Sequence, residues 1–325
     1  MELTFTAISE DRPGSAWAGW FQSLWPAYRR WYLREGIEER PTYLACRRAI
    51  RTHMPELLSL YEELCELAGG GDLAARFLSL YRPPAYLSAC SQAVWPGREP
   101  MLVRNYDYSP LAFDALIMRT HWRERAVIGM SDGLIGLVDG INDAGLSLSL
   151  TFGGRRAVGE GFGVPIILRY VLEICETSEQ AARVLARVPS HMAYNVTALD
   201  AAGRFVTVYL SPDRDAIVTS APVATNHQER VEWGQHAKAT ATVERERYIL
   251  QGLMRFETTQ DHFIDAFLRP PLYALRFAQG NGTLYTAAYW PQRRSVSYIW
   301  PTLEWRLGFE DFDAGSKRIL YPLAA

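Results

Sequence analysis

The sequence is poor in lysine. Lys238 and Lys317 are its two lysines among 325 residues, so its 34 basic residues are nearly all arginine. Lysine chemistry such as a Schiff base would have to use one of these two. Basic and acidic residues nearly balance, and the formal net charge is −2 at pH 7. A chain without a basic excess has no field that attracts phosphate backbones, which excludes sequence-independent binding of nucleic acid as its main role.

Long hydrophobic runs, a secretory signal and paired metal ligands are also missing. No run of about 18 apolar residues predicts a membrane span. The first residues, MELTFTAISEDRPG, lack the basic and apolar regions of a signal peptide. The four cysteines form no CxxC pair, and the six histidines show no HxxxH or HExxH spacing. We therefore expect a cytoplasmic protein with no membrane span, no metal and no cofactor.

The composition is that of a folded globular chain, with 48% hydrophobic and 22% charged residues. The length allows two domains or one large one. The first 89 residues look all-helical. Aromatic residues recur at three- and four-residue steps over 17–31, a second helix fits 42–67, and a third fits 72–81. We predict a helical prosegment or N-terminal domain over 1–89 and a catalytic domain over 90–325.

The pattern changes from residue 86 onward, where short apolar runs alternate with turn residues. Strands are predicted over 86–95, 101–104, 126–130, 135–139, 146–150, 194–199, 205–210, 216–224, 283–290 and 295–300. Helices are predicted over 165–175, 178–188 with Ser178 as N-cap, 242–255 and 261–268. Groups of strands alternate with groups of helices, which indicates an α+β fold of layered sheets rather than a doubly wound βαβ fold.

Cys90 is the first candidate for chemistry. It lies where the helical block ends. Arg104 is the last residue of the next predicted strand, and Asp107 follows three residues later. A hairpin would bring that strand beside Cys90. A thiol needs a lowered pKa or a nearby base before it can attack an amide carbonyl. Arg104 could stabilise the thiolate, and Asp107 could orient an amine. The alternative is a buried structural cysteine beside a structural ion pair.

Further segments appear in an order that resembles a known family. They are Cys90-Ser91, Arg104-Asn105-Tyr106-Asp107, Asp139-Gly140-Ile141-Asn142-Asp143-Ala144-Gly145-Leu146-Ser147, Thr225-Asn226-His227 and Thr242-Val243-Glu244-Arg245. Together they resemble the acyl-CoA:6-aminopenicillanic acid acyltransferase family of N-terminal nucleophile (Ntn) hydrolases, whose relatives are the choloylglycine hydrolases and penicillin V acylases. The resemblance covers roughly residues 86–300.

The resemblance implies a four-layer αββα sandwich, preceded here by the helical N-terminal segment, and a chain that cuts itself between Ala89 and Cys90. The freed α-amino group of Cys90 then serves as the base for its own thiol. An α-amine has a pKa of about 7.7–8.0 and a free thiol about 8.5, so the proton can move between them near neutral pH. By the same resemblance, Asp107 would hold the amine and Arg104 would lie close to the sulfur.

The remaining roles concern the oxyanion of the tetrahedral intermediate. The resemblance assigns the side-chain amide of Asn226 as one donor and a backbone N–H near Thr151 as the other. Arg245 would organise these groups as a cation behind them, and Arg247, two residues away, is the alternative for that role.

The implied reaction runs through a thioester on Cys90. Water as the acceptor gives an amidase, and an amine or thiol gives an acyltransferase, with acyl-CoA left open as a co-substrate. The expected partners are a small-molecule linear amide and the chain's own prosegment after cleavage, and a homo-oligomer stays open.

Two alternatives remain open. The family often has glycine where this chain has Ala89, and alanine strains less easily into the geometry of cleavage. The chain would then stay uncleaved and act as a non-catalytic member that binds a ligand or partner. The second alternative pairs Cys90 with His227 as in papain-like enzymes.

Overall fold

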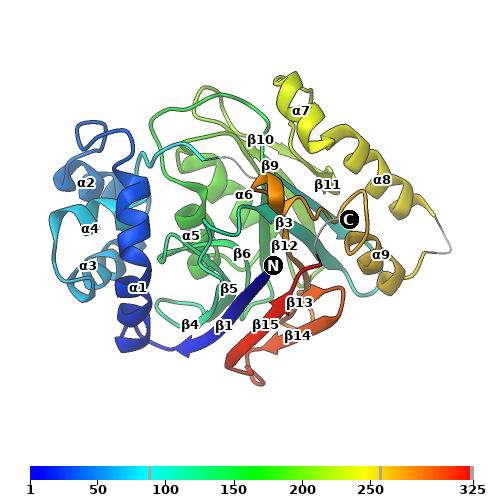
Figure 1. The fold of residues 1–325 in the computed structure, drawn as a ribbon, viewed down its shortest axis with the longest axis horizontal. Helices are drawn as coiled ribbons and strands as arrows, with labels where there is room; N and C mark the ends of the chain where they lie inside the picture. Colours follow the sequence, from blue (N-terminus) through cyan, green and yellow to red (C-terminus); the bar gives the residue numbers. More distant parts are fainter. Residues whose placement is uncertain (87–88, 256–257, 323–325) are drawn as a thin grey trace.

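The computed structural model describes residues 1–86, 89–255 and 258–322, and within these residues the strands form one sheet of nine and one of six. The two sheets pack face to face, with strand β2 (Ala89–Trp95) of the smaller against β7 (Ser147–Phe152) of the larger. Helices cover both outer faces (Figure 1). The predicted α+β, four-layer αββα sandwich is therefore confirmed.

The nine-stranded sheet is antiparallel except for one parallel pair, β1 with β4. Its strands in spatial order are β10 (Ile217–Thr219), β9 (Phe205–Leu210), β8 (Tyr194–Leu199), β7 (Ser147–Phe152), β6 (Gly136–Asn142), β5 (Val127–Asp132), β4 (Leu116–Thr120), β1 (Glu2–Glu10) and β15 (Gly315–Leu320).

The six-stranded sheet is antiparallel throughout and carries the candidate nucleophile on β2. Its strands in spatial order are β11 (Val223–Ala224), β2 (Ala89–Trp95), β3 (Met101–Tyr108), β12 (Gly282–Trp290), β13 (Ser295–Trp300) and β14 (Leu303–Gly308).

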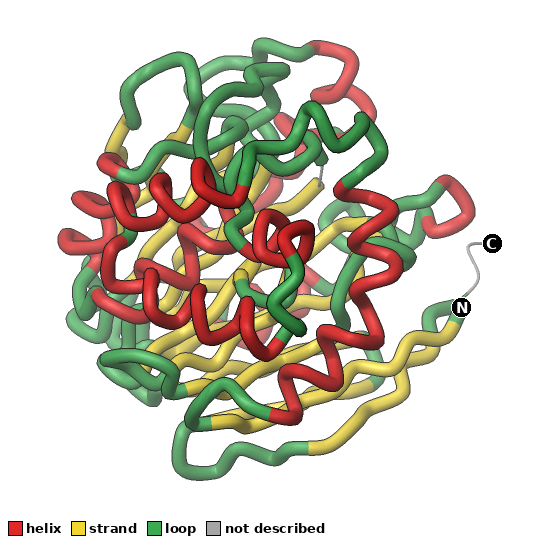
Figure 2. Tube along the Cα trace, turned by 90° about the vertical axis from the view of Figure 1, so that its left-hand side faces the viewer, coloured by secondary structure: helices red, strands yellow, loops and turns green. Residues whose placement is uncertain are grey.

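The helices fall into three groups. Helices α5 (Val164–Ile174) and α6 (Ser178–Arg187) cover the nine-stranded sheet, and α8 (Thr242–Met254) and α9 (Gln260–Phe267) cover the six-stranded sheet. The others are α1 (Ser15–Tyr32), α2 (Tyr43–His53), η1 (Pro55–Leu57), α3 (Leu58–Leu67), α4 (Asp72–Leu78), α7 (Gly234–Thr240) and η2 (Phe277–Gln279). Figure 2, seen from the side of α1–α4, shows helices in front of the strands.

Helix α5 is covered on both sides and is almost entirely apolar; its two charged residues, Arg169 and Glu173, form a buried ion pair with each other. Its residues from Val164 to Glu173 are buried. One face packs on β6, while the Tyr170 hydroxyl donates to Glu56 of η1 at 2.5 Å. A helix that is hydrophobic all round requires such burial. The N-terminal helices therefore lie outside α5 and extend the hydrophobic core.

The expectation of an all-helical block over 1–89 is wrong at its start. Residues 2–10 form β1, which pairs with β15 on one side and β4 on the other. Its alternating Leu3, Phe5 and Ala7 have the two-residue period of a strand. The predicted helix over 42–67 is interrupted at Met54, because Pro55 cannot continue it and begins η1. The division of the chain at residue 89 stays a prediction.

Other element boundaries differ in smaller ways. The predicted strand over 216–224 is two strands, β10 and β11, which belong to different sheets. The cap of α6 is Thr177, in a capping box with Gln180, and not Ser178. Residues 87–88 of the predicted strand over 86–95 lie outside the described residues. Strands β4, β14 and β15 and helix α7 were not predicted.

Candidate active site

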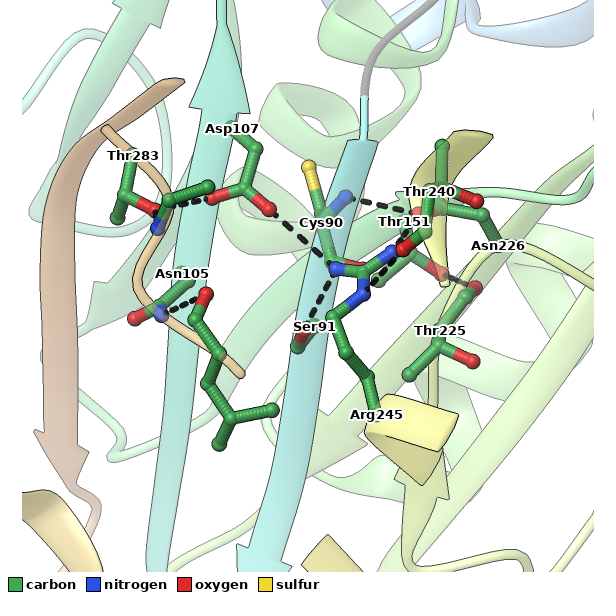
Figure 3. Close-up of polar contacts among 12 residues, drawn as sticks. Cys90, Ser91, Asn105, Asp107, Thr151, Thr225, Asn226, Thr240, Arg245 and Thr283 are labelled. Carbon is green, nitrogen blue, oxygen red and sulfur yellow. Dashed lines mark hydrogen bonds and ion pairs between the residues drawn. The ribbon is translucent and has the colours of Figure 1, made fainter. Parts of the chain in front are cut away.

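Cys90 is the second residue of β2, and its side chain is fully buried. It lies directly opposite Tyr106 of β3. Opposed residues of an antiparallel pair point to the same face of the sheet. The thiol therefore shares the inner face of the six-stranded sheet with Arg104 and Tyr106, whereas Asn105 and Asp107 lie on the face toward α8 and α9 (Figure 3).

Arg104 bonds directly to the candidate nucleophile. Its Nη2 donates to Cys90 Sγ at 3.2 Å, and its Nη1 donates to Asp139 Oδ2 at 2.9 Å and to the carbonyl of Val138 at 2.7 Å. Burial lowers the pKa of this guanidinium, but the charges of Cys90 and Asp139 outweigh burial and the pKa is raised. Arg104 is therefore a permanent cation beside the sulfur, which favours the thiolate.

Asp139 holds that arginine in place. Its carboxylate accepts from the hydroxyls of Tyr285 at 2.6 Å and Tyr289 at 2.5 Å, besides the bond from Arg104. All of these groups are buried between the sheets. Asp139 is the first residue of one of the sequence motifs, and no role was predicted for it. Two tyrosines four residues apart, and so on one face of one predicted strand, were the available signal.

Asp107 lies opposite Ala89 in the β2–β3 ladder, next to the peptide bond between Ala89 and Cys90. Its Oδ1 accepts from the Thr283 hydroxyl at 2.7 Å, and its Oδ2 pairs with Arg245 Nη1 at 3.3 Å. Burial raises the pKa of this carboxyl, and Arg245 and Thr283 counteract part of the rise. Asp107 therefore lies beside the Ala89–Cys90 peptide on the side of α8.

Asn226 follows the short strand β11 and contacts the same peptide group. Its Oδ1 accepts from the backbone N–H of Cys90 at 3.1 Å and from Arg245 Nη2 at 2.5 Å. Its Nδ2 donates to the carbonyl of Phe152 at 3.2 Å. The Thr242 hydroxyl accepts from the Asn226 backbone N–H at 2.6 Å and fixes the segment to the start of α8.

Arg245, and not Arg247, reaches the site. From α8, its Nη1 donates to the Cys90 carbonyl at 3.0 Å and to the Ser91 hydroxyl at 2.8 Å. The side chain is buried, which lowers the pKa of its guanidinium, and the charge of Asp107 opposes that fall. Arg247 is exposed on the same helix. One guanidinium therefore links β2, Asp107 and Asn226 (Figure 3).

Thr151 supports the segment that carries Asn226. Its hydroxyl donates to the carbonyl of Thr225 at 2.7 Å, and Asn195 Nδ2 donates to both of these oxygens, at 3.0 Å and 2.9 Å. Asn195 was assigned no role from the sequence. Its buried amide instead joins β8 to the residues before Asn226.

The histidines near the site have other partners or are neutral. His227 contacts Thr242 Oγ1 at 3.0 Å through Nδ1 and Glu246 at 3.3 Å through Nε2, so its two ring nitrogens are directed toward α8. His236 of α7 lies near Arg245, and burial, followed by the charge of Arg245, lowers the pKa of His236 to about 4. Neither arrangement is that of a base hydrogen-bonded to the Cys90 thiol.

Two cavities reach β3, one through Asp107 and the other through Tyr108. One of about 340 Å³, on the side of α8, is lined by Ala89, Asp107, His236 and Arg245. The other, of about 140 Å³, lies beneath α1 and is mostly apolar.

Across the described ranges, no group of three or more His, Cys, Asp and Glu side chains could hold a metal ion. In the same ranges no helix has the length and apolarity that crossing a membrane requires.

Two packed sheets between helical layers, with a cysteine at the start of a central strand, have the architecture of the Ntn hydrolases. The chain belongs to the acyl-coenzyme A:6-aminopenicillanic acid acyl-transferase family, whose model matches residues 95–305. The predicted family is thereby confirmed. The match includes Arg104, Asp107, Asn226 and Arg245, and it begins five residues after Cys90.

Solved structures are similar to this chain at low identity. Penicillin V acylase from Agrobacterium tumefaciens is 13% identical, with a TM-score of 0.48 over 70% of this chain and 90% of that one. A mutant conjugated bile acid hydrolase from Clostridium perfringens is 12% identical, with a TM-score of 0.43 over 73% and 98%. An N-acylethanolamine-hydrolyzing acid amidase ortholog from Caenorhabditis elegans is 17% identical, with a TM-score of 0.43 over 62% and 93%. A comparison with curated proteins found no match.

Proposed function

We propose that this protein cleaves itself before Cys90 and then acts on a linear amide, as a cysteine amidohydrolase or acyltransferase, through a thioester on Cys90. One observation carries the proposal. The sulfur of Cys90 accepts from Arg104 while the nitrogen of the same residue donates to Asn226, beside the carboxylate of Asp107. An N-terminal cysteine reacts through its sulfur as nucleophile and its α-nitrogen as base. Both of these atoms of Cys90 already make polar contacts that suit these roles.

The cleavage step begins with attack of Cys90 Sγ on the carbonyl carbon of Ala89. The C–S bond forms, the C–N bond breaks, and the thiol proton ends on the nitrogen of Cys90. Water then hydrolyses the thioester, which leaves a carboxylate on Ala89 and restores the thiol. The hydrogen bond from the Cys90 N–H to Asn226 holds the scissile peptide, and that from Arg245 to the Cys90 carbonyl holds the peptide that follows it.

The amide reaction uses the amine that cleavage has released. The α-amine takes the proton from the thiol, the thiolate attacks the substrate carbonyl, and the same proton passes to the leaving amine. Asp107 and Asn226 Oδ1 are acceptors for the ammonium form. Asn226 Nδ2 is the side-chain donor for the oxyanion, a second donor being the backbone N–H near Thr151, and such a donor is worth about 10²–10³ in rate. Water or another nucleophile then removes the acyl group.

The first experiment is intact mass and N-terminal sequencing of the purified protein beside Cys90→Ala. We expect fragments 1–89 and 90–325 from the wild type and a whole chain from the variant. Cys175→Ala is the matched control, since Cys175 is also buried, on the far side of β6 at the end of α5, and this variant should still cleave. An uncleaved wild type would contradict the proposal and favour the non-catalytic binding protein.

The second experiment separates hydrolysis from transfer. Processed protein is given a chromogenic anilide with and without an added amine that can accept the acyl group. Loss of the carboxylic acid product in favour of a new amide identifies a transferase, and an unchanged acid product identifies an amidase.

A further inference from the structure

We propose that Tyr285 and Tyr289 are positioning residues for the nucleophile, and that they act on Cys90 through Asp139 and Arg104. Their hydroxyls donate to the two oxygens of the Asp139 carboxylate, Tyr285 to Oδ2 at 2.6 Å and Tyr289 to Oδ1 at 2.5 Å. By these bonds they hold Arg104 toward the sulfur and favour the thiolate. The inference rests on the proposed function for the role of Cys90 and extends it to two residues of another strand.

Strand β12 places the two tyrosines on either side of Arg104. Side chains at alternate positions of a strand share a face, so Tyr285, Ala287 and Tyr289 lie together. Ala287 is directly opposite Arg104 of β3, and opposed residues point to the same face. The small side chain of Ala287 leaves space for the guanidinium. The tyrosine on each side then reaches across to Asp139, which belongs to β6 of the other sheet.

Arg104 depends on this carboxylate for its orientation. Its Nη1 donates to Asp139 Oδ2 at 2.9 Å and to the Val138 carbonyl at 2.7 Å, while its Nη2 donates to Cys90 Sγ at 3.2 Å. Among the described residues, Nε of Arg104 has no hydrogen-bond partner. The guanidinium is thus fixed from the side of β6, and a displacement of the carboxylate would move the donor that faces the sulfur.

The two hydroxyls also change the field at the sulfur. The negative charge of Asp139 opposes the effect of Arg104 on the thiolate. Each O–H bond directs its positive end at that carboxylate and offsets part of the opposition, in a buried region where electrostatic interactions are strong. Burial, and then the charge of Asp139, raise the pKa of both tyrosines, so each keeps the proton that it donates. Removing a hydroxyl should therefore raise the pKa of the Cys90 thiol.

The test measures the pH at which half of Cys90 reacts with iodoacetamide, followed by peptide mapping. Phenylalanine keeps the ring and removes only the hydroxyl. We expect this midpoint to rise by about 0.5 pH unit in Tyr285→Phe and in Tyr289→Phe, and by about 1 pH unit in the double variant. Tyr298→Phe should raise it less, because the Tyr298 hydroxyl is 3.5 Å from Asp139 Oδ1. An unchanged midpoint in the double variant would overturn the inference.

The other titratable groups around the thiol are the same in all these proteins, so their titrations cancel in the comparison. They are Tyr106 and Tyr108 of β3, Tyr194 of β8, Asp132 of β5, and Asp107 and Arg245 on the side of α8. Burial raises the pKa of the three tyrosines, which stay neutral near pH 7.

Tyr61→Phe is the matched control. Tyr61 of α3 is fully buried, and its hydroxyl donates to the Ala75 carbonyl at 2.8 Å. This variant also loses one buried hydrogen bond, but in the N-terminal helices, so its Tm should fall while the Cys90 midpoint stays within about 0.1 pH unit of wild type. An equal rise of the midpoint in Tyr61→Phe would assign the effect to lost stability and contradict the inference.

A double-mutant cycle shows whether the effect passes through Asp139. With Asp139→Asn already in place, adding Tyr289→Phe should change the midpoint by less than about 0.2 pH unit, because the charge that the hydroxyl offsets is absent. A full rise of about 0.5 pH unit in that background would mean that Tyr289 acts by another route, and the inference would be wrong.

Amide turnover by the processed protein gives a second readout. Neither tyrosine lines the cavity at Asp107 or the one beneath α1, so KM should change less than about twofold. Below the midpoint, kcat should fall about threefold in each single variant and about tenfold in the double, and it should return toward wild type as pH rises. A loss that is equal at every pH would indicate a merely structural role.

The inference and the proposed function can fail separately. If the wild type stays uncleaved, the proposed function fails, and the alkylation midpoints of the whole chain still test the tyrosines. If the wild type cleaves itself and turns over an amide while the midpoint of the double variant equals that of wild type, the inference fails and the proposed function stands.

Discussion

Arg104 and Cys90 form a buried contact in which Nη2 donates to Sγ over 3.2 Å, and both side chains are fully shielded from solvent. The other end of the same guanidinium is held by Asp139. A cation in so apolar a place interacts strongly with the charge it faces. The thiolate of Cys90 therefore depends on Arg104, and the fold depends on the pair that Arg104 makes with Asp139.

These two dependences can be separated with paired variants. Arg104→Gln leaves Asp139 buried without its cation and should lower the free energy of unfolding by about 3–5 kcal/mol. Arg104→Gln with Asp139→Asn should recover most of that stability. In both proteins the pH at which half of Cys90 reacts with iodoacetamide should rise by about one unit or more, because the cation beside the sulfur is gone. Alkylation is followed by peptide mapping, and an unchanged midpoint in the double variant would contradict the role of Arg104.

Arg245 and Arg247 offer a matched pair on one helix. Arg245→Ala removes donors to Cys90, Ser91 and Asn226 and leaves Asp107 without its cation. We expect amide turnover and self-cleavage to fall at least about 10²-fold, with lowered stability. Arg247→Ala removes an exposed side chain, and its rates should stay within about twofold of wild type. Similar losses in both variants would show that the contacts of Arg245 are not the cause.

Ala89 limits the rate of self-cleavage if strain at the scissile peptide is part of the step. It is buried in β2 opposite Asp107, where the peptide must leave its extended geometry. Glycine reaches strained conformations at lower cost than alanine, and a β-branched residue at higher cost. Ala89→Gly should therefore cleave several-fold faster and Ala89→Val several-fold slower, measured as the cleaved fraction against time. A reversed order would argue against strain.

The N-terminal fragment should stay bound after cleavage. Strand β1 is hydrogen-bonded on both sides, to β4 and to β15, so that it is an interior strand of the nine-stranded sheet. Removing it would open the sheet and expose Phe5 and Trp17, which are fully buried. Fragments 1–89 and 90–325 should co-elute in native gel filtration and separate only in denaturant. A fragment 1–89 that elutes alone without denaturant would contradict this.

The sequence predicted local elements well and long-range ones poorly. Strands over 194–199, 205–210 and 295–300 have the predicted bounds because their alternation and flanking turns are local. Strand β1 was missed, since its partner β15 lies more than 300 residues away and no local turn marks the pairing. The structure joins the motif residues in one connected set of hydrogen bonds, and their catalytic roles stay predictions. Asp139 and its tyrosines were not assigned, because only the packing of the two sheets brings them together.

Asp132 should make stability depend on pH. Burial, followed by the charge of Asp114, raises the pKa of Asp132 in the folded protein to about 8, whereas an unfolded aspartate has about 3.9. Between these values the folded chain keeps a proton that the unfolded chain has lost. The free energy of unfolding from this group therefore falls as pH rises from about 4 to about 8, and the loss is complete above that range.

Asp132→Asn removes this titration and serves as the comparison. Tyr28, Tyr86 and Tyr108 face the same region and stay neutral in this range, because burial raises the pKa of each, and Asp114 is common to both proteins. The variant should therefore gain on the wild type as pH rises, with the difference in Tm between them widening from pH 5 to pH 8.5. A difference that is constant over that range, measured by calorimetry on the same preparation, would mean that Asp132 is ionised throughout.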